Sequence, residues 1–293
     1  MNTDKQLSID TGAVLRTVLM FCVSIELLLF TLDYHVNMAG GSSSSAIRRL
    51  FNTAREDSLP GWFAIMQTAM LAVTVWVIWA IVRQHGSTWQ RRGWATIAIF
   101  FTYLAFDDGA HIHERVGTWF DGAGEASAIG AWMLDMFPSY RWQIVFMPAF
   151  ALMGLFIFGF LLRELRGWKP RAVVFVAFSC LAFAVLMDFF EGLTPDHPLN
   201  PYTALTNMWH LDYWTARSFD ENPYDTLLHF SKSFEECLEM FAMTMLWLVF
   251  LQHLTRVADG IRLSVRHTPL IPVDAMETDE RPVPAQQAVP STV

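Results

Sequence analysis

The sequence predicts an all-α protein: a polytopic membrane helical bundle of about six transmembrane helices, with both termini cytoplasmic. Hydrophobic residues make up 53% of the 293 residues and charged residues only 16%, so the chain is more apolar than a soluble domain. Six apolar runs are long enough to cross a hydrocarbon core of about 30 Å. Twelve Trp and 24 Phe residues suit the aromatic belts that mark membrane interfaces.

The apolar runs differ in where their polar residues fall. Pro60 precedes the second run and fits a helix N-terminus, where its missing N–H is not needed. The third and fifth runs become polar at their ends, and the sixth starts polar and becomes apolar. The second and fourth carry no acidic residue in their interiors, so we expect them to be supporting helices. The expected spans are 13–33, 61–83, 93–114, 142–162, 172–191 and 226–254.

Lys and Arg residues predict the orientation. Thirteen of the twenty lie with the termini on one side of the expected spans, six lie on the other side, and Lys232 lies within the last span. The basic side of a membrane protein faces the cytoplasm. We therefore expect residues 1–266 to form a single transmembrane domain and residues 267–293 to form a disordered cytoplasmic tail. The expected location is a bacterial inner (plasma) membrane, which the chain crosses several times.

Other features exclude some classes of function. Cys22, Cys180 and Cys237 are far apart in apolar segments and no CxxC pair exists, so we expect free thiols and no thiolate metal site. The net charge of -8 gives no sign of nucleic-acid binding. Residues 46–52 are expected to form a short interfacial helix. The aromatic stretch 209–214 is expected to lie on the membrane surface or to act as a lid.

Ionisable residues inside the expected spans are the main sign of function. A charged side chain at the bilayer centre costs about 2.5–3.5 kcal/mol, so such residues are paired, hydrated or used to bind something. On the predicted topology, spans one, three and five end with acids and span six begins with them, so all lie in the outer half of the membrane. The sequence thus predicts one polar chamber that opens outward. Its residues are Glu26, Asp107, Asp108, His111, Asp188, His229, Glu235 and Glu236.

The spacing of Asp108 and His111 favours a metal site within this chamber. A carboxylate three residues before a histidine occurs in the di-iron sites of helical bundles, where carboxylates of neighbouring helices complete the site. We expect Asp108, His111, Glu191, His229 and Glu236 to be metal ligands. Carboxylate and imidazole ligands without thiolate suit a divalent metal, and we favour iron over zinc or manganese.

Two further acids, Glu26 and Asp188, are expected to have catalytic roles as proton carriers or as partners that orient the ligands. The leading hypothesis is a metal-dependent enzyme that oxidises or hydroxylates a lipid or other apolar substrate. Any redox partner would be separate, because the chain has no nucleotide-binding glycine motif. The alternatives are a zinc-dependent membrane hydrolase, a proton- or cation-coupled transporter, and an accessory subunit of a larger membrane complex in which Lys232 neutralises Glu236.

Two stretches resemble a broad set of bacterial multi-pass membrane proteins of unestablished function. The first is residues 105–115, where an apolar helix ends in the acidic pair Asp107-Asp108 followed by His113-Glu114. The second is the expected outer loop at residues 49–63. The resemblance covers about the first 115 residues. It implies the membrane architecture and implies no particular reaction.

Overall fold

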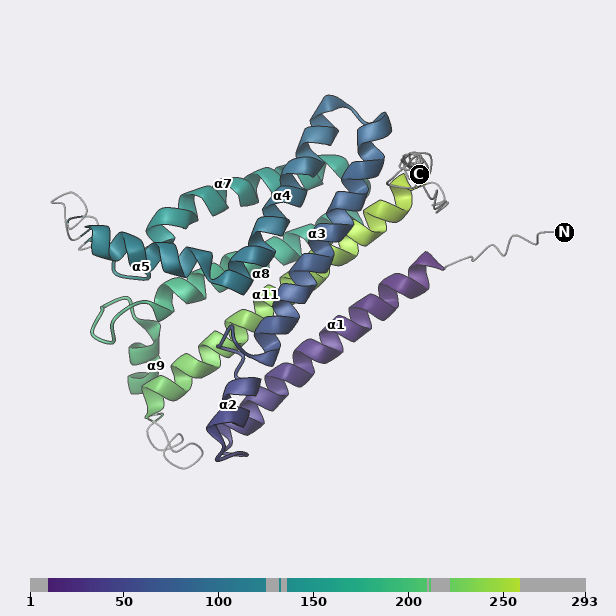
Figure 1. Cartoon of the computed structure of the whole chain (residues 1–293). Coiled ribbons are helices and arrows are strands. Elements are labelled where there is room, and N and C mark those ends of the chain that lie inside the picture. Colours follow the sequence, from purple (N-terminus) through teal and green to yellow (C-terminus); the bar gives the residue numbers. More distant parts are fainter. Residues whose placement is uncertain (1–9, 125–131, 133–135, 210, 212–221, 259–293) are drawn as a thin grey trace, which may run out of the picture. The chain divides into compact units, whose positions relative to one another are not determined.

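The computed structural model describes residues 10–124, 132, 136–209, 211 and 222–258. Within these ranges every regular element is a helix, which confirms the all-α prediction (Figure 1). The expected tail at 267–293 lies outside the described residues, as do His210 and residues 212–214 of the aromatic stretch. Five helices are long and apolar enough to span a membrane. They are α1 (Thr11–Asp33), which continues into the π-helical turn η1 (Tyr34–Met38), α3 (Leu59–His85), α7 (Arg141–Glu164), α8 (Trp168–Glu191) and α11 (Pro223–Val257).

The third expected span, 93–114, is interrupted in the structure. It consists of α4 (Thr88–Ala110), which begins at a capping box between Ser87 and Gln90, and the start of α5 (Ile112–Gly124). The helix breaks at His111, whose φ of 53° lies in the left-handed region that residues other than glycine rarely adopt. The prediction of one continuous helix through residue 114 was therefore wrong. Helical periodicity cannot reveal a left-handed residue that ends one helix and starts the next.

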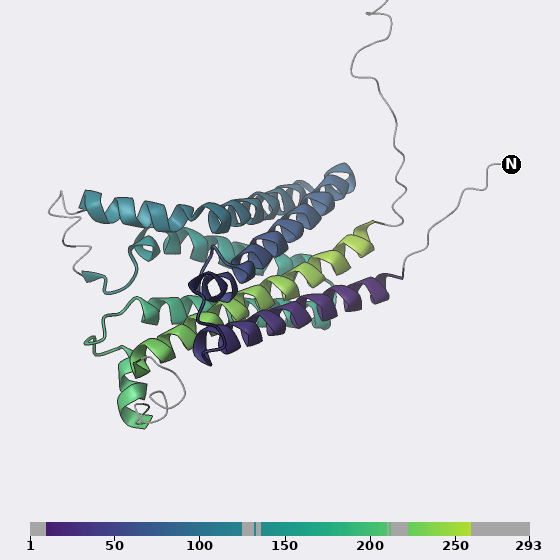
Figure 2. The ribbon, with the colours of Figure 1, turned by 60° about the horizontal axis from the view of Figure 1, so that its bottom comes forward.

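The short helices lie outside the five candidate spans. Helix α2 (Ser45–Phe51) is close to the short helix expected at 46–52, and α9 (Pro201–Trp209) precedes α11. Helices α3 and α4 form a hairpin and lie side by side (Figures 1 and 2). Trp76 on α3 donates a hydrogen bond to Thr102 on α4. Such bonds between helices replace the hydrophobic driving force that lipid does not supply.

The apolar core occupies the end of the bundle that is distant from the acidic residues. Trp94 on α4 is fully buried and stacks on His253 of α11, with ring centroids 4.8 Å apart. Phe160 on α7 and Phe250 on α11 contact the same indole edge-on. Helix α8 packs along α11, and its residues Val174 and Ala177 belong to the same core. Helix α7 also contacts α5, where a Cβ on Gly117 would lie 2.8 Å from the backbone nitrogen of Trp142.

Gly93 lets α4 approach α7, because a Cβ at this position would overlap the ring of Phe160. We expect Gly93→Val to lower the free energy of unfolding by about 1–3 kcal/mol, the usual effect of overpacking a core. Unfolding of the detergent-solubilised protein by dodecyl sulfate would measure the change. Gly159→Val on α7 is the matched control, since nothing lies within 4 Å of a Cβ there. Equal stability of the two variants would show that α4 and α7 are not in close contact.

Candidate functional site

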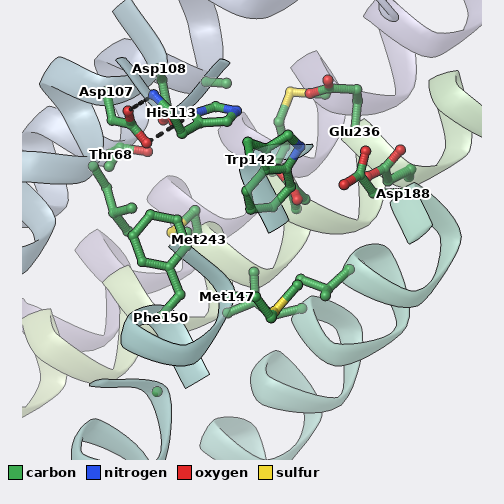
Figure 3. A pocket seen from close by; sticks show the side chains of 18 of the residues that line it. Thr68, Asp107, Asp108, His113, Trp142, Met147, Phe150, Asp188, Glu236 and Met243 are labelled. Carbon is green, nitrogen blue, oxygen red and sulfur yellow. Dashed lines mark hydrogen bonds and ion pairs between the residues drawn. The ribbon is translucent and has the colours of Figure 1, made fainter. Parts of the chain in front are cut away.

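A cavity of about 1260 Å³ lies among α3, α4, α5, α7, α8 and α11 (Figure 3). Its lining is acidic toward one end of the helices and apolar toward the other. The ends of α4 and α8 and the start of α11 meet at the acidic part, as the predicted directions of the spans require. The acidic residues that line the cavity are Glu56, Asp107, Asp108, Glu114, Asp121, Asp188, Glu191, Glu235, Glu236 and Glu239.

Six of these acids come from three helices and form one electrostatically connected group. Glu236 interacts with the charges of Glu239, Asp108 and Glu191, and Glu235 interacts with those of Glu239 and Asp188. We call this group the chamber carboxylates. Its members are Asp108 on α4, Asp188 and Glu191 on α8, and Glu235, Glu236 and Glu239 on α11.

Lys232 is the basic residue of α11 that reaches the chamber carboxylates. Its Nζ lies 3.8 Å from Glu191 Oε2 and donates a hydrogen bond of 3.3 Å to the Tyr140 hydroxyl. It also lies 5.6 Å from the centre of the Tyr140 ring. The i,i+4 neighbour Glu236, which the sequence suggested as its ion-pair partner, is not the carboxylate nearest to Lys232 in these contacts. A single ammonium group leaves most of the six carboxyls uncompensated if all of them are ionised.

Glu191 is the most deeply buried member of a subset that could hold a metal ion. It is 6% exposed, and its Oε1 has no hydrogen-bond partner among the described residues. One carboxylate oxygen from each of Asp188, Glu191 and Glu235 lies within 4.8 Å of the others. Asp188 is oriented by Gln143 on α7, whose Nε2 donates a bond of 2.7 Å to Oδ2. Such outer partners hold metal ligands in place.

We call the part of the cavity that is lined by the start of α5 and the loop before α3 its mouth. The break at His111 places His113 at this mouth. Asp107, which is 1% exposed, accepts a bond of 2.9 Å from the His113 backbone N–H. Its other oxygen lies 3.0 Å from His113 Nδ1. The His113 ring also packs against Trp142 of α7, with centroids 5.0 Å apart. Asp107 therefore fixes both the start of α5 and the direction of the His113 ring.

The loop before α3 brings Glu56 to the same mouth. Ser58 caps α3 by accepting a bond from the Gly61 N–H. A Cβ on Gly61 would overlap the backbone oxygen of Glu56, so a glycine lets the loop fold back at this point. Asp57 holds the loop through Arg55 and Arg49. The Glu56 carboxylate contacts the ring of His111.

Several groups outside the candidate spans have shifted pKa values, among them His113, Tyr140 and Asp57. Burial lowers the pKa of His113, but the hydrogen bond and charge of Asp107 outweigh it, so the pKa is raised overall. Burial raises the pKa of the Tyr140 hydroxyl, and the Lys232 ammonium opposes part of this rise. Hydrogen bonds from Arg55 and Arg49 lower the pKa of Asp57 to about 2. The loop that carries Glu56 is therefore held by a carboxylate that is charged at all physiological pH values.

A second set of buried polar residues lies between α1 and α11. Glu26 on α1 accepts hydrogen bonds from Gln67 Nε2, at 3.0 Å, and from Thr244 Oγ1, at 2.6 Å. Asp33, which is 1% exposed, accepts bonds from Ser233 and from Asn37 and lies 3.3 Å from His229 Nε2. These contacts attach α1 to α11 at two levels along both helices.

A family profile matches residues 17–254 of the chain. The chain belongs to this family, which is described as "Domain of unknown function (DUF8692)". No curated protein and no solved structure matches the chain. The chamber carboxylates and the residues of the cavity mouth all lie within the region that defines the DUF8692 family.

The structure brings together four of the seven residues that the sequence suggested for the site. Asp108, Asp188, Glu191 and Glu236 line the cavity. The other three are elsewhere among the described residues. Glu26 and His229 take part in the contacts between α1 and α11, and His111 lies at the mouth beside Glu56 and does not line the cavity.

Four residues of the site were not among those that the sequence suggested: Glu56, His113, Tyr140 and Glu239. Glu235 was expected in the chamber but was not proposed as a metal ligand. A wide cavity accepts both of the adjacent residues Glu235 and Glu236, although they point about 100° apart. Glu239 lies four residues after Glu235 on the same helix face, and this spacing is a signal that could have found Glu239.

The contacts between α1 and α11 predict that Asp33 stabilises the fold and that it does not bind metal, in contrast to the chamber carboxylates. We expect Asp33→Ala to lower the free energy of unfolding by about 1–3 kcal/mol, because it removes the acceptor that Ser233 and His229 share. Metal content should stay the same in Asp33→Ala and in His229→Gln. Dodecyl sulfate unfolding and elemental analysis measure the two quantities. Loss of bound metal in His229→Gln would instead restore His229 to the candidate ligands.

Proposed function

We propose that this chain is a metal-dependent enzyme of a bacterial inner (plasma) membrane, which binds divalent metal through the chamber carboxylates. In this proposal the protein oxidises or hydroxylates a lipid or other apolar substrate. One observation carries it: six carboxyls from three helices face one cavity, and the Oε1 atom of the buried Glu191 has no partner among the described residues. Bound cations would supply the charge that Lys232 alone does not.

The proposed topology has six spans, with α4 as the sixth member. Its 23 residues are about 34 Å long at 1.5 Å per residue, which is enough to cross the hydrocarbon core. It lies alongside α3 over its length. The basic residues near the start of α4 and the ends of α3 and α7 favour a cytoplasmic location for that side and for both termini. The acidic end of the cavity then faces the periplasm.

We propose iron as the metal of the chamber. Asp188, Glu191 and Glu235 offer oxygen ligands, and Asp108, Glu236 and Glu239 stand beside them. In the di-iron and di-manganese centres of helical bundles, carboxylates of several helices bind the metals together with histidines. A redox metal here would supply activation of dioxygen. Hydroxylation would insert one oxygen atom of O₂ into a C–H bond and release the other as water, consuming two electrons and two protons. A separate redox partner would deliver the electrons.

The apolar part of the cavity supports a substrate from the bilayer. Figure 3 shows Met147, Phe150 and Met243 near the acidic side chains. Leu155 and Phe175 also line the cavity, and they are 70% and 62% exposed on the surface that lipid would cover. The cavity therefore extends toward the lipid-facing surface. A long-chain substrate could place its apolar part there while its reacting carbon lies beside the carboxylates.

A zinc-dependent hydrolase is the second candidate. The group formed by Asp188, Glu191 and Glu235 provides three ligands, which suffices for one zinc ion and leaves a position for an activated water. Transport is less favoured, because the cavity becomes apolar away from its acidic end and a path for ions would need polar groups there. The identity and number of bound metal ions separate these candidates.

The metal proposal predicts a specific loss. Detergent-purified protein, prepared without chelator, should contain about two iron ions per chain in the chamber if the centre is of the di-iron type. We expect Glu191→Gln/Glu235→Gln to lose these ions, because amides do not replace charged ligands. Elemental analysis by mass spectrometry measures the content. Glu26→Gln is the matched control, since this buried acid is held by Gln67 and Thr244. Unchanged metal in the double variant would exclude the chamber as the site, and one zinc ion would favour hydrolysis.

The substrate proposal predicts that a bulky side chain at Gly154 blocks the apolar part of the cavity. Gly154 lines the cavity on α7, where a Cβ would lie 3.8 Å from the Phe178 ring. In vesicles of phosphatidylcholine with a photoreactive acyl chain, we expect cross-links to Phe178 and Met243. Gly154→Trp should reduce them about tenfold, equivalent to roughly 1.4 kcal/mol.

Gly159→Trp is the matched control, because a Cβ at Gly159 meets nothing within 4 Å. It should keep the cross-links of the wild type. Cross-linking that is equal in the two tryptophan variants would mean that acyl chains do not enter this part of the cavity.

A further inference from the structure

Four ionisable side chains converge at the mouth of the cavity, apart from the chamber carboxylates. One ligand atom from each of Glu56, His113 and Glu114 lies within 4.8 Å of the others. The His111 ring contacts the Glu56 carboxylate, and its Nδ1 lies 3.9 Å from Glu114 Oε2. The four residues come from two segments that are about 50 residues apart in the sequence, the loop before α3 and the junction of α4 and α5. We call them the mouth group.

The contact between Glu56 and His111 links the two segments of the mouth group. It does not include His113 or Glu114, although one ligand atom of each lies within 4.8 Å of a carboxylate oxygen of Glu56. A metal ion among these atoms would give the side chains a common partner.

His113 has the surroundings of a metal-binding histidine. Its Nδ1 is paired with the carboxylate of Asp107 at 3.0 Å, which leaves Nε2 as the nitrogen available to a ligand. Histidines that bind metals nearly always direct their second nitrogen to a carboxylate or carbonyl in this way. Asp107 is 1% exposed and also holds the His113 backbone, so the ring direction is fixed before any ion binds.

We propose that Glu56, His111, His113 and Glu114 form a second metal site that binds one divalent transition-metal ion of the zinc type. Two imidazoles and two carboxylates are a ligand set suited to zinc, and to ferrous iron or manganese in a higher coordination number. Asp107 is a positioning residue for this site. The inference goes beyond the proposed function and does not depend on it, because the chamber carboxylates supply none of the four ligands.

The position of the site suggests what the ion does. Glu56 belongs to the loop that Asp57 holds through Arg55 and Arg49, while the other three ligands lie where α4 gives way to α5. A bound ion would join these two segments across the edge of the cavity. It would thereby fix the left-handed turn at His111 and the width of the cavity mouth.

The test uses full-length protein in detergent, stripped with chelator and then dialysed against Zn²⁺. We expect Glu56→Gln and His111→Ala each to bind about one zinc ion per chain fewer than the wild type. Asp121→Asn is the control, because this cavity-lining acid is paired with Arg141 and lies outside the mouth group. It should bind as much zinc as the wild type. Equal zinc content in all of these proteins would overturn the inference.

A second measurement separates the two metal sites and does not rely on the mouth variants folding. In Glu191→Gln/Glu235→Gln the mouth ion should remain, and its X-ray absorption spectrum should show imidazole scattering. Chelation should also increase deuterium exchange in residues 52–58 and 111–114 of this variant. Absence of both the imidazole signal and the exchange response would overturn the mouth site. If this variant contained as much zinc as the wild type, the result would contradict the chamber site and would leave the mouth site unaffected.

Discussion

Acidic groups enclosed among apolar helices must be balanced where they lie, and the arrangement of the helices around α11 depends on this constraint. The chain meets it in two ways on two sides of one helix. On the side of α1, Glu26 and Asp33 are compensated by hydrogen-bond donors of α3 and α11. On the side of α8, six carboxyls meet a single ammonium group, that of Lys232. The first arrangement is complete within the protein, whereas the second calls for cations or protons from outside.

The sequence could predict that the acids of α4, α8 and α11 share one level of the bundle, but it could not predict which residues make up the site. Span directions place the acids of α4, α8 and α11 at one level, and the cavity gathers them there. The sequence suggested His229 and Glu236 as ligands of one site and Lys232 as an ion-pair partner of Glu236. In the structure α11 lies between α1 and α8, so His229 faces Asp33 while Lys232 faces Glu191. Which neighbour a helix face meets depends on tertiary packing, and the period of the helix carries no information about it.

The break at His111 explains the other differences. A straight helix through residue 114 would turn the His113 side chain away from that of Asp107. The left-handed turn instead folds His113 back onto Asp107 and brings His111 to Glu56. The two stretches that carry the resemblance to bacterial membrane proteins, 49–63 and 105–115, thus meet at one place. Neither stretch reveals this contact by itself.

The attachment of α1 has a consequence for how the protein is made. Thr244 and Ser233, which bind Glu26 and Asp33, follow these acids by 218 and 200 residues. At about 5–20 residues per second, α11 leaves the ribosome roughly 10–40 s after α1. During that interval Gln67 is the one donor of this set already synthesised for Glu26, and Ser233 and His229 are not yet available to Asp33. A first helix inserted in the membrane would therefore carry two incompletely compensated acids until α11 is made, and a chain that stops before α11 would keep them in that state.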